Sequence, residues 1–192
     1  FSAYGGYPYQ TVMHEVGHLI GLGHGGGYNG NVNASTQQLG AYDTRLWTIM
    51  SYINPQTSSA KYFGSYPVTG TNWGVSPDGY SYVPTKPMIL DIVAIQQIYG
   101  KATTGPLASG GQVFGFNTNI TGAIKPYFDF TVNTHPVITI WDGGTNNTLD
   151  LSGFGGNSVI NLNPGAFSSA AGATRNSMKR CCSPNIGRPP PL

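Results

Sequence analysis

Apolar residues recur at helical spacing between Pro87 and Gly100. A proline in the first turn and a glycine just beyond the last turn are typical of the two ends of a helix. The apolar positions repeat every three or four residues, at Met88, Ile92, Ile95 and Tyr99. We therefore expect a helix over residues 87–99 whose apolar face packs in the core rather than forming a binding surface. A second helix is expected over residues 9–20.

The period changes from helical to alternating after a linker, residues 101–107. Alternating apolar and polar residues between Gly and Asn turns predict five short strands, over residues 113–116, 128–132, 137–142, 148–153 and 158–162. Residues 25–86 are rich in Gly, Asn, Ser and Tyr and show little periodicity, as is typical of long loops that carry function. The fold class is therefore α+β, with a helical and loop-rich part (1–100) and a β-rich part (101–172).

Charged residues make up only 8% of the 192-residue chain, and the net charge is +2. Four of the nine basic residues fall in the last 18 positions: Arg175, Lys179, Arg180 and Arg188. The rest of the chain has no basic stretch interleaved with aromatic residues, so nucleic-acid binding is not expected. Sparse charge with abundant Gly, Asn, Ser and Thr favours an extracellular protein. No signal peptide begins the chain, and no apolar run approaches the ~20 residues of a membrane span.

Residues 173–192 differ from the rest of the chain because they are rich in Pro and Arg. They contain the two cysteines, Cys181 and Cys182, which are adjacent and so provide no disulfide framework. We expect an unrelated, disordered tail with unpaired thiols. The alternative is a strained vicinal disulfide.

The stretch HEVGHLIGLGH, which begins at His14, matches the pattern H-E-x-x-H-x-x-G-x-x-H at every position. Residues i and i+4 share one face of a helix, so His14 and His18 point the same way. Gly21 lets the chain turn back, and His24 then supplies a third nitrogen. Three protein ligands leave one position open for water, as in catalytic rather than structural zinc sites. Glu15 lies within reach of that water and is the natural general base.

The alternative is that these histidines fit the pattern by chance and merely pack or face solvent. Histidine is a rare residue, and three of the four histidines of the chain lie inside the motif, which favours a metal site. The fourth, His135, precedes Pro136 and is expected in a surface loop before a strand.

An extended histidine motif followed by a methionine turn identifies the metzincin class of zinc endopeptidases, and WTIMSY at residues 47–52 resembles that turn. Met50 would pack beneath the zinc, although an ordinary core methionine would look the same. Four segments resemble, in order, those of the serralysins, which are secreted bacterial metzincins: HGGGYN, YDTRLWTIMSY, PMILDIVAIQQIYG and ITIWDGGTNNTLDLSGF. The resemblance runs with gaps from about residue 7 to about residue 169.

The serralysin resemblance implies a role for Tyr52, two residues after the turn methionine. In that family this tyrosine is a zinc ligand in the resting enzyme and stabilises the oxyanion during turnover. The resemblance also implies that residues 1–100 form the C-terminal portion of a metzincin catalytic domain and that residues 101–172 begin a β-roll or sandwich-like domain. The calcium-binding nonapeptide repeat of such rolls does not occur in tandem.

A calcium site is a further implication of the resemblance, because WDGGTNN is similar to the family segment WDxGGND. The matching ligands are Asp142, Gly144 and Asn147. Asn147 replaces a carboxylate, which should weaken Ca²⁺ binding, and Gln112 stands where the family usually has threonine. Without an ion, Asp142 and Asp150 would form turns and cap strands instead.

Together these features predict a secreted, zinc-dependent endopeptidase that acts on unfolded or flexible proteins, with Glu15 as general base and Tyr52 as the oxyanion donor. The alternative is a catalytically inactive, truncated zinc-binding chain or a β-rich binding module. Only 13 residues precede His14, so we expect a chain truncated at both ends that has little activity. Its exposed apolar residues would include Val12, Leu19, Ile20 and Leu22. The sequence predicts neither the preferred side chain of the substrate nor the oligomeric state.

Overall fold

The computed structural model describes residues 7–54, 74–75, 81–82, 84, 86–134, 136–170 and 179–182. Its helices are α1 (Tyr7–Leu19), α2 (Ala34–Gln37), α3 (Ile89–Tyr99) and α4 (Lys125–Phe128), the last preceded by the 3₁₀ turn η2 (Gly122–Ile124). Its strands are β1 (Gly74–Val75), β2 (Ser81–Tyr82), β3 (Val113–Gly115), β4 (Val137–Thr139), β5 (Thr148–Asp150), β6 (Phe167–Ala170) and β7 (Lys179–Cys182). The chain is therefore a mixed helix and sheet protein with short strands, as its sequence predicts at this level.

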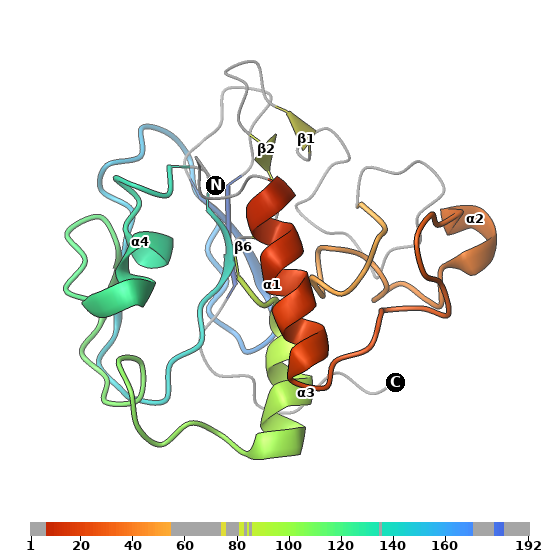
Figure 1. Ribbon diagram of the computed structural model, residues 1–192. Coiled ribbons are helices and arrows are strands. Elements are labelled where there is room, and N and C mark those ends of the chain that lie inside the picture. Colours follow the sequence, from red (N-terminus) through yellow and green to blue (C-terminus); the bar gives the residue numbers. More distant parts are fainter. Residues whose placement is uncertain are drawn as a thin grey trace.

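Helices α1 and α3 form where the sequence predicts helices and lie in the middle of the molecule, with α2 and α4 on opposite sides (Figure 1). The hydroxyl of Tyr99, in the last turn of α3, donates to the carbonyl oxygen of Ile20 beyond the end of α1, at 3.0 Å. The predicted apolar face of α3 is buried only at its start: Met88 is 1% exposed, whereas Tyr99 is 65% exposed. The prediction of a core face along the whole helix is wrong, because the last turn of α3 extends beyond the core.

The strands form three small sheets. β1 pairs with β2 in antiparallel orientation, and β3 pairs with β5 in parallel. β7 lies between β4, to which it is parallel, and β6, to which it is antiparallel. Gly115 in β3 has a φ of 108°, and a Cβ atom there would overlap the carbonyl of Asp150 in β5. The close parallel pairing of β3 and β5 therefore depends on a glycine at this position.

Two of the five predicted strands do not form. Residues 128–132 run from the end of α4 into a turn. Phe128 and Phe130 are both buried in one hydrophobic cluster, so the alternation there reflects packing from a helix end and a turn rather than a strand. Residues 158–162 contain one isolated bridge residue and no strand, and the side chain of Val159 is 64% exposed. Alternation over five residues thus did not distinguish strands from irregular segments.

β7 lies within residues 173–192, which the sequence predicts to be a disordered tail. Its backbone pairs with both β4 and β6. The sequence KRCC has no alternating apolar pattern and so does not predict a strand. The strand forms nevertheless, because pairing uses backbone groups and does not require that pattern. The rest of that tail, and the side chains of the two cysteines, lie outside the described residues.

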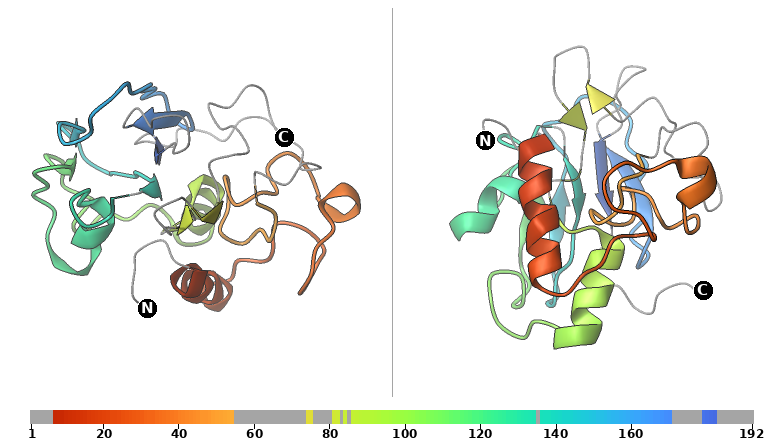
Figure 2. Two further views of the ribbon diagram at one scale, coloured as in Figure 1. Left: turned by 90° about the horizontal axis from the view of Figure 1, so that it is seen from above. Right: turned by 45° about the vertical axis from the view of Figure 1, so that its right-hand side comes forward.

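Two hydrophobic clusters meet at β4. Successive side chains of a strand point to opposite faces, so Val137 packs in one cluster and Ile138 in the other. The first cluster joins the segment before Met50 to the start of α3, through Leu46, Trp47, Ile49, Met50, Met88 and Ile89. The second lies on the side of β3 and α4, away from α2 (Figure 2). The first cluster supports the histidine motif, because Met13 and Leu22 from that motif and its flank pack against it.

Candidate metal centre

Three imidazole rings from the motif come together, two from α1 and one from the loop that follows it. One nitrogen from each of His14, His18 and His24 lies within 4.8 Å of the others. The ring centroids of His14 are 4.8 Å from His18 and 5.2 Å from His24, and those of His18 and His24 are 4.6 Å apart. Helix α1 positions the first two rings, one turn apart on the same face. Among the described residues, these three form the one cluster of His, Cys, Asp or Glu with this geometry.

The third histidine reaches the cluster because the chain leaves α1 sharply. The amide of Gly21 donates to the His18 carbonyl at 3.0 Å, and the amide of Leu22 donates to the Gly17 carbonyl at 2.9 Å. Gly21 has a φ of 97°, which a residue with a Cβ atom adopts only with strain. The turn therefore depends on glycine at this position.

Each of the three rings is held by a main-chain carbonyl at its Nδ1 atom. His14 contacts the carbonyl of Ile49 at 2.8 Å, His18 that of Leu22 at 2.8 Å, and His24 that of Tyr28 at 2.7 Å. A carbonyl oxygen only accepts hydrogen bonds, so each Nδ1 carries the proton and each Nε2 presents a lone pair. This is the arrangement by which proteins orient metal-binding histidines.

The Nε2 atoms fit a metal ion because they lie close together, and the one other hydrogen-bonding group found near them in the described residues is the Tyr52 hydroxyl, next to His24. The Nε2 atoms of His18 and His24 are 3.0 Å apart, although both present lone pairs. The Nε2 of His14 is buried and has no hydrogen-bond partner. Burial lowers the pKa of His14, against the hydrogen bond to Ile49, and so favours the neutral ring that binds metals. A cation among the three nitrogens would satisfy all of these atoms.

Tyr52 lies beside the three rings. Its hydroxyl is 3.0 Å from the Nε2 of His24, and its ring centroid is 4.6 Å from that of the same histidine. Glu15 is exposed and lines a pocket of about 540 Å³ together with His14 and Tyr52. A carboxylate, a phenol and the imidazole of His14 therefore border one space.

Met50 lies in the buried segment that closes the centre from the side of α3. It is 2% exposed, and a Cβ atom on Gly17 of α1 would lie 2.5 Å from its sulfur. The methionine therefore packs directly against the helix that carries the first two histidines. This contact agrees equally with the family role of Met50 and with ordinary core packing.

Asp91, in the first turn of α3, fixes the backbone before Met50. Its carboxylate accepts from the Thr48 hydroxyl at 2.5 Å, the Ile49 amide at 2.9 Å and the Met88 amide at 2.7 Å. Burial raises the pKa of Asp91 to about 6, although these hydrogen bonds act in the opposite direction. Because the carbonyl of Ile49 holds His14, Asp91 acts on the metal centre through one residue.

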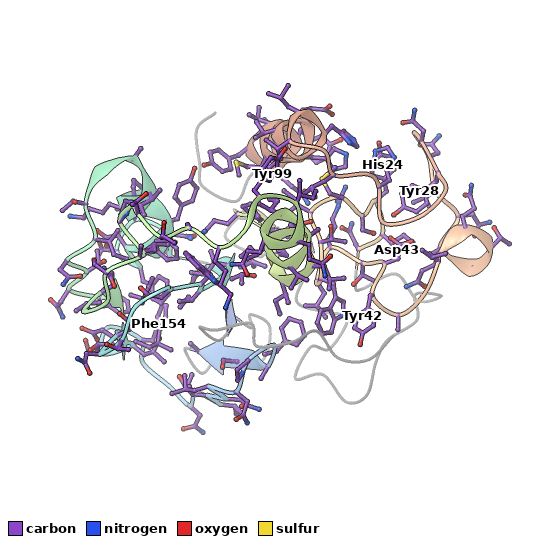
Figure 3. All side chains as sticks on the ribbon, turned by 90° about the horizontal axis from the view of Figure 1, so that it is seen from below. His24, Tyr28, Tyr42, Asp43, Tyr99 and Phe154 are labelled. Carbon is purple, nitrogen blue, oxygen red and sulfur yellow. The ribbon has the colours of Figure 1, made fainter. Side chains whose placement is uncertain are left out.

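Tyr28 connects the loop that carries His24 to the segments that carry Asp43 and Tyr52. Its hydroxyl donates to Asp43 at 2.5 Å, lies 3.2 Å from the Ser51 hydroxyl and accepts from the Tyr52 amide at 3.2 Å. Burial, together with the bond to Asp43, raises the pKa of Tyr28 to about 12, so the phenol stays protonated. Figure 3 shows His24, Tyr28 and Asp43 close together on the loop side of the molecule.

The segment predicted to bind calcium forms a tight turn. Asp142 is 1% exposed, and one of its oxygens accepts from the Gly144 amide at 2.5 Å while the other has no partner. The Asn147 side chain accepts from the Gln112 amide at 3.1 Å. Asp150 accepts from Asn117 at 2.9 Å and from the Ser152 amide at 2.9 Å. His135 lies outside the described residues.

The sequence interpretation missed Tyr28, Asp43 and Asp91 as supports of the centre. Asp91 did carry a signal, since it is the sole charged residue of the apolar helix ILDIVAIQQIY. A lone carboxylate on such a helix must either face solvent or be buried with partners. Tyr28 and Asp43 lie in segments that resemble serralysins, but nothing in the sequence paired them, because their contact joins residues 15 apart through irregular loops.

Comparisons with known proteins agree with the motif. Residues 106–180 match the family model described as Peptidase M10 serralysin C terminal. Metallopeptidase AprA of Pseudomonas marginalis is 37% identical over 173 residues, which are 88% of this chain and 32% of that protein. Serralysin C of Dickeya chrysanthemi is 35% identical over 173 residues (88% and 32%), and serralysin of Proteus mirabilis is 34% identical over 174 residues (90% and 31%).

These alignments extend beyond residues 106–180, since they cover nearly nine-tenths of the chain. The chain spans about a third of the length of these relatives, at 31–32%. By its sequence, the chain is similar to the serralysins over nearly nine-tenths of its length.

Proposed function

We propose that this chain carries the zinc centre of an endopeptidase that hydrolyses peptide bonds in protein substrates. The observation that carries the proposal is the set of three Nε2 atoms, each freed for a metal by a main-chain bond at Nδ1. Three nitrogen ligands with one open position are typical of catalytic zinc. The names of the relatives, a metallopeptidase and serralysins, support the same assignment.

Three kinds of side chain divide the work. His14, His18 and His24 would hold zinc, which when bound polarises a carbonyl and acidifies water. The exposed carboxylate of Glu15 accepts a proton from water in the pocket and later delivers it to the leaving amine. The hydroxyl of Tyr52 is available to donate to the oxygen that gains negative charge, a contact that is strongest in the transition state.

The finer fold assignment also belongs to this proposal. Residues 1–100 would be the C-terminal portion of a metzincin catalytic domain, and residues 101–172 the start of a β-roll. The parallel pairing of β3 with β5 supports the second part. In that part Asp142, Gly144 and Asn147 would hold Ca²⁺, supported by the buried Asp142 oxygen that has no partner.

The protein would act outside the cell, as the family resemblance implies. Among the described residues, no helix is long and apolar enough to cross a membrane.

A second candidate function is a non-catalytic, zinc-binding chain. One observation favours it: α1 presents three apolar side chains to solvent, on a face other than the one that carries His14 and His18. Val12 is 45% exposed, Val16 41% and Leu19 84%. An apolar helix face that is open to solvent is typical of a surface that another segment or molecule covers.

Hydrolysis of fluorescent casein separates the two functions. The proposal expects activity that a chelator abolishes and added zinc restores. Activity that is unaffected by the chelator would contradict a metal mechanism, and zinc binding without hydrolysis would favour the second candidate.

Metal content after dialysis tests the ligands independently. His24→Ala should lose zinc, whereas His135→Ala, which changes a histidine outside the motif, should retain it. Equal zinc in the two variants would refute the three-histidine centre.

A further inference from the structure

Gln10 and Arg45 lie in the wall of the 540 Å³ pocket, and the proposed mechanism uses neither of them. Gln10 lies one turn before His14 on the same face of α1. It is only 3% exposed, and neither its amide nitrogen nor its amide oxygen has a hydrogen-bond partner. A buried amide without partners is unfavourable unless a ligand or water supplies them.

Arg45 brings a positive charge to the same pocket. Its Nε donates to the Ser51 carbonyl at 3.1 Å, and one terminal nitrogen donates to the Asn54 side chain at 2.9 Å. These two bonds fix the guanidinium and use two of its five N–H groups. The rest remain available on a half-buried side chain.

No carboxylate of the described residues neutralises Arg45. Within the described residues, the one ion pair joins Lys125 and Asp129 and does not involve Arg45. Burial lowers the pKa of Arg45, and the groups that act against this are tyrosines: Tyr7, Tyr28 and Tyr52. A guanidinium stays charged in proteins, so the pocket holds a cation that forms no ion pair with a carboxylate of the described residues.

The chemistry of these two side chains specifies their ligand. A guanidinium matches the two oxygens of a carboxylate and binds them with paired, charge-assisted hydrogen bonds. The Gln10 amide adds a further donor. Glu15 lines the same pocket but is exposed, so solvent screens its repulsion of a bound carboxylate. The attraction between that carboxylate and the half-buried Arg45 is screened less.

We propose that Arg45 and Gln10 form a subsite that binds a carboxylate of the peptide substrate next to the scissile bond. The inference rests on the proposed endopeptidase function and names its substrate class: peptides with Asp or Glu close to the cleaved bond. A free C-terminal carboxylate has the same chemistry and is the other source of the ligand.

Binding of matched peptides tests the subsite. Three fluorescein-labelled octapeptides of Gly and Ala would be compared: one with a central Glu and an amidated end, one with Gln in its place, and the Gln peptide with a free C-terminus. Anisotropy would be measured on the full chain with a chelator, which prevents metal-dependent cleavage, and again after zinc addition. We expect the Glu peptide to bind the parent chain at least tenfold more tightly than the amidated Gln peptide.

Variants test whether Arg45 and Gln10 cause the preference for the Glu peptide. Arg45→Gln should bring the Glu and Gln peptides within about twofold of each other. Gln10→Glu places a competing carboxylate in the pocket that Arg45 lines and should remove the preference, while the bonds from Arg45 to Ser51 and Asn54 remain. Lys101→Gln removes an exposed basic residue and is the matched control for net charge, so it should preserve the tenfold ratio.

Each outcome bears on the proposal. Tighter binding of the free C-terminus, lost in Arg45→Gln, supports the carboxylate subsite and assigns it to chain ends instead of acidic side chains. Equal binding of all three peptides, binding of none, or an equal loss in Lys101→Gln would overturn it. Because the first measurement involves neither zinc nor turnover, its failure is distinguishable from failure of zinc-dependent hydrolysis.

Discussion

Tyr28 shows how a residue that does not touch the metal can still control the centre. Its main-chain oxygen holds the ring of His24, and its hydroxyl accepts the amide of Tyr52. Its ring centroid lies 5.9 Å from that of His24, in a stacked arrangement. One residue thus positions both a proposed ligand and the proposed oxyanion donor.

Replacing Tyr28 by phenylalanine should destabilise the protein. The change leaves the carboxylate of Asp43 and the amide of Tyr52 without this partner, at a cost of about 1–3 kcal/mol. Urea unfolding would measure it. Tyr99→Phe, which removes an exposed hydroxyl that bonds Ile20, is the control and should cost less than about 0.5 kcal/mol. Equal effects of the two variants would show that the buried hydroxyl has no special role.

Substitutions of Glu15 and Tyr52 should have different effects on kcat in an active form of the protein. Glu15→Gln should lower kcat by roughly 10²–10⁴-fold while zinc content is retained, since the general base is lost and no ligand is changed. Tyr52→Phe should be milder and lower kcat with little change in KM. Steady-state kinetics with zinc analysis would check both. Near-parental activity of Glu15→Gln would end the proposed mechanism.

At the scale of elements, α3 is joined to the segment before Met50 by hydrogen bonds to one buried carboxylate, that of Asp91. The pKa of Asp91 is raised to about 6, above its usual value near 3.9, because burial disfavours the charge. A raised pKa means that the folded state holds its proton more tightly than the unfolded state does. The resulting stabilisation is fully present below about pH 4 and is lost as pH rises through about 6.

Asp91→Asn should therefore change the pH dependence of stability. The variant lacks the titration, so between pH 4 and pH 7 the parent should lose on the order of 3 kcal/mol relative to it. Urea unfolding of both proteins at several pH values measures the difference. Thr48→Val removes a hydrogen bond that favours the charged form, so it should shift the loss to higher pH. A parent–variant difference that does not vary with pH would contradict the raised pKa.

The elements that the sequence predicts well are those whose geometry is local. The spacing of His14 and His18 on one helix follows from the helical period alone, and α1 forms as expected. The strands at 128–132 and 158–162 were predicted wrongly, since a strand needs a distant partner that five residues do not specify. The partners of Tyr28 and Asp91 could not be predicted for the same reason, although Asp91 itself carried a signal: the Thr48–Asp91 bond joins residues 43 apart.

At the scale of the whole molecule, α1 carries an apolar face that is open to solvent. Of the positions expected to be exposed, Val12 and Leu19 are exposed, whereas Ile20 and Leu22 are half-buried. The chain also spans only about a third of the length of its relatives, at 31–32%. A substrate held on one side alone loses positioning, which can amount to several kcal/mol of the barrier.

We therefore expect the 192-residue chain to have weak proteolytic activity on its own. Its kcat/KM on a flexible protein would be compared, at equal zinc content, with that of a version extended by the upstream half of a serralysin. The extended version should be faster by several orders of magnitude. Sedimentation should show that the chain alone associates, and that replacing Val12, Val16 and Leu19 with polar residues reduces this. Comparable kcat/KM values would show that covering α1 is unnecessary.

The main-chain bonds at the three histidines have a consequence for mutational tolerance. A carbonyl oxygen belongs to the backbone, so no substitution at Leu22 or Ile49 removes the acceptor itself. What a substitution can disturb is the path of the backbone, and that path depends on Gly21 with its φ of 97°. In a scan scored by zinc retention, Leu22→Met should be tolerated, whereas Gly21→Val should weaken zinc binding by about 10–100-fold. The reverse order would mean that side chains rather than the backbone hold the rings. The positions of the three imidazoles would then change with substitutions at neighbouring residues.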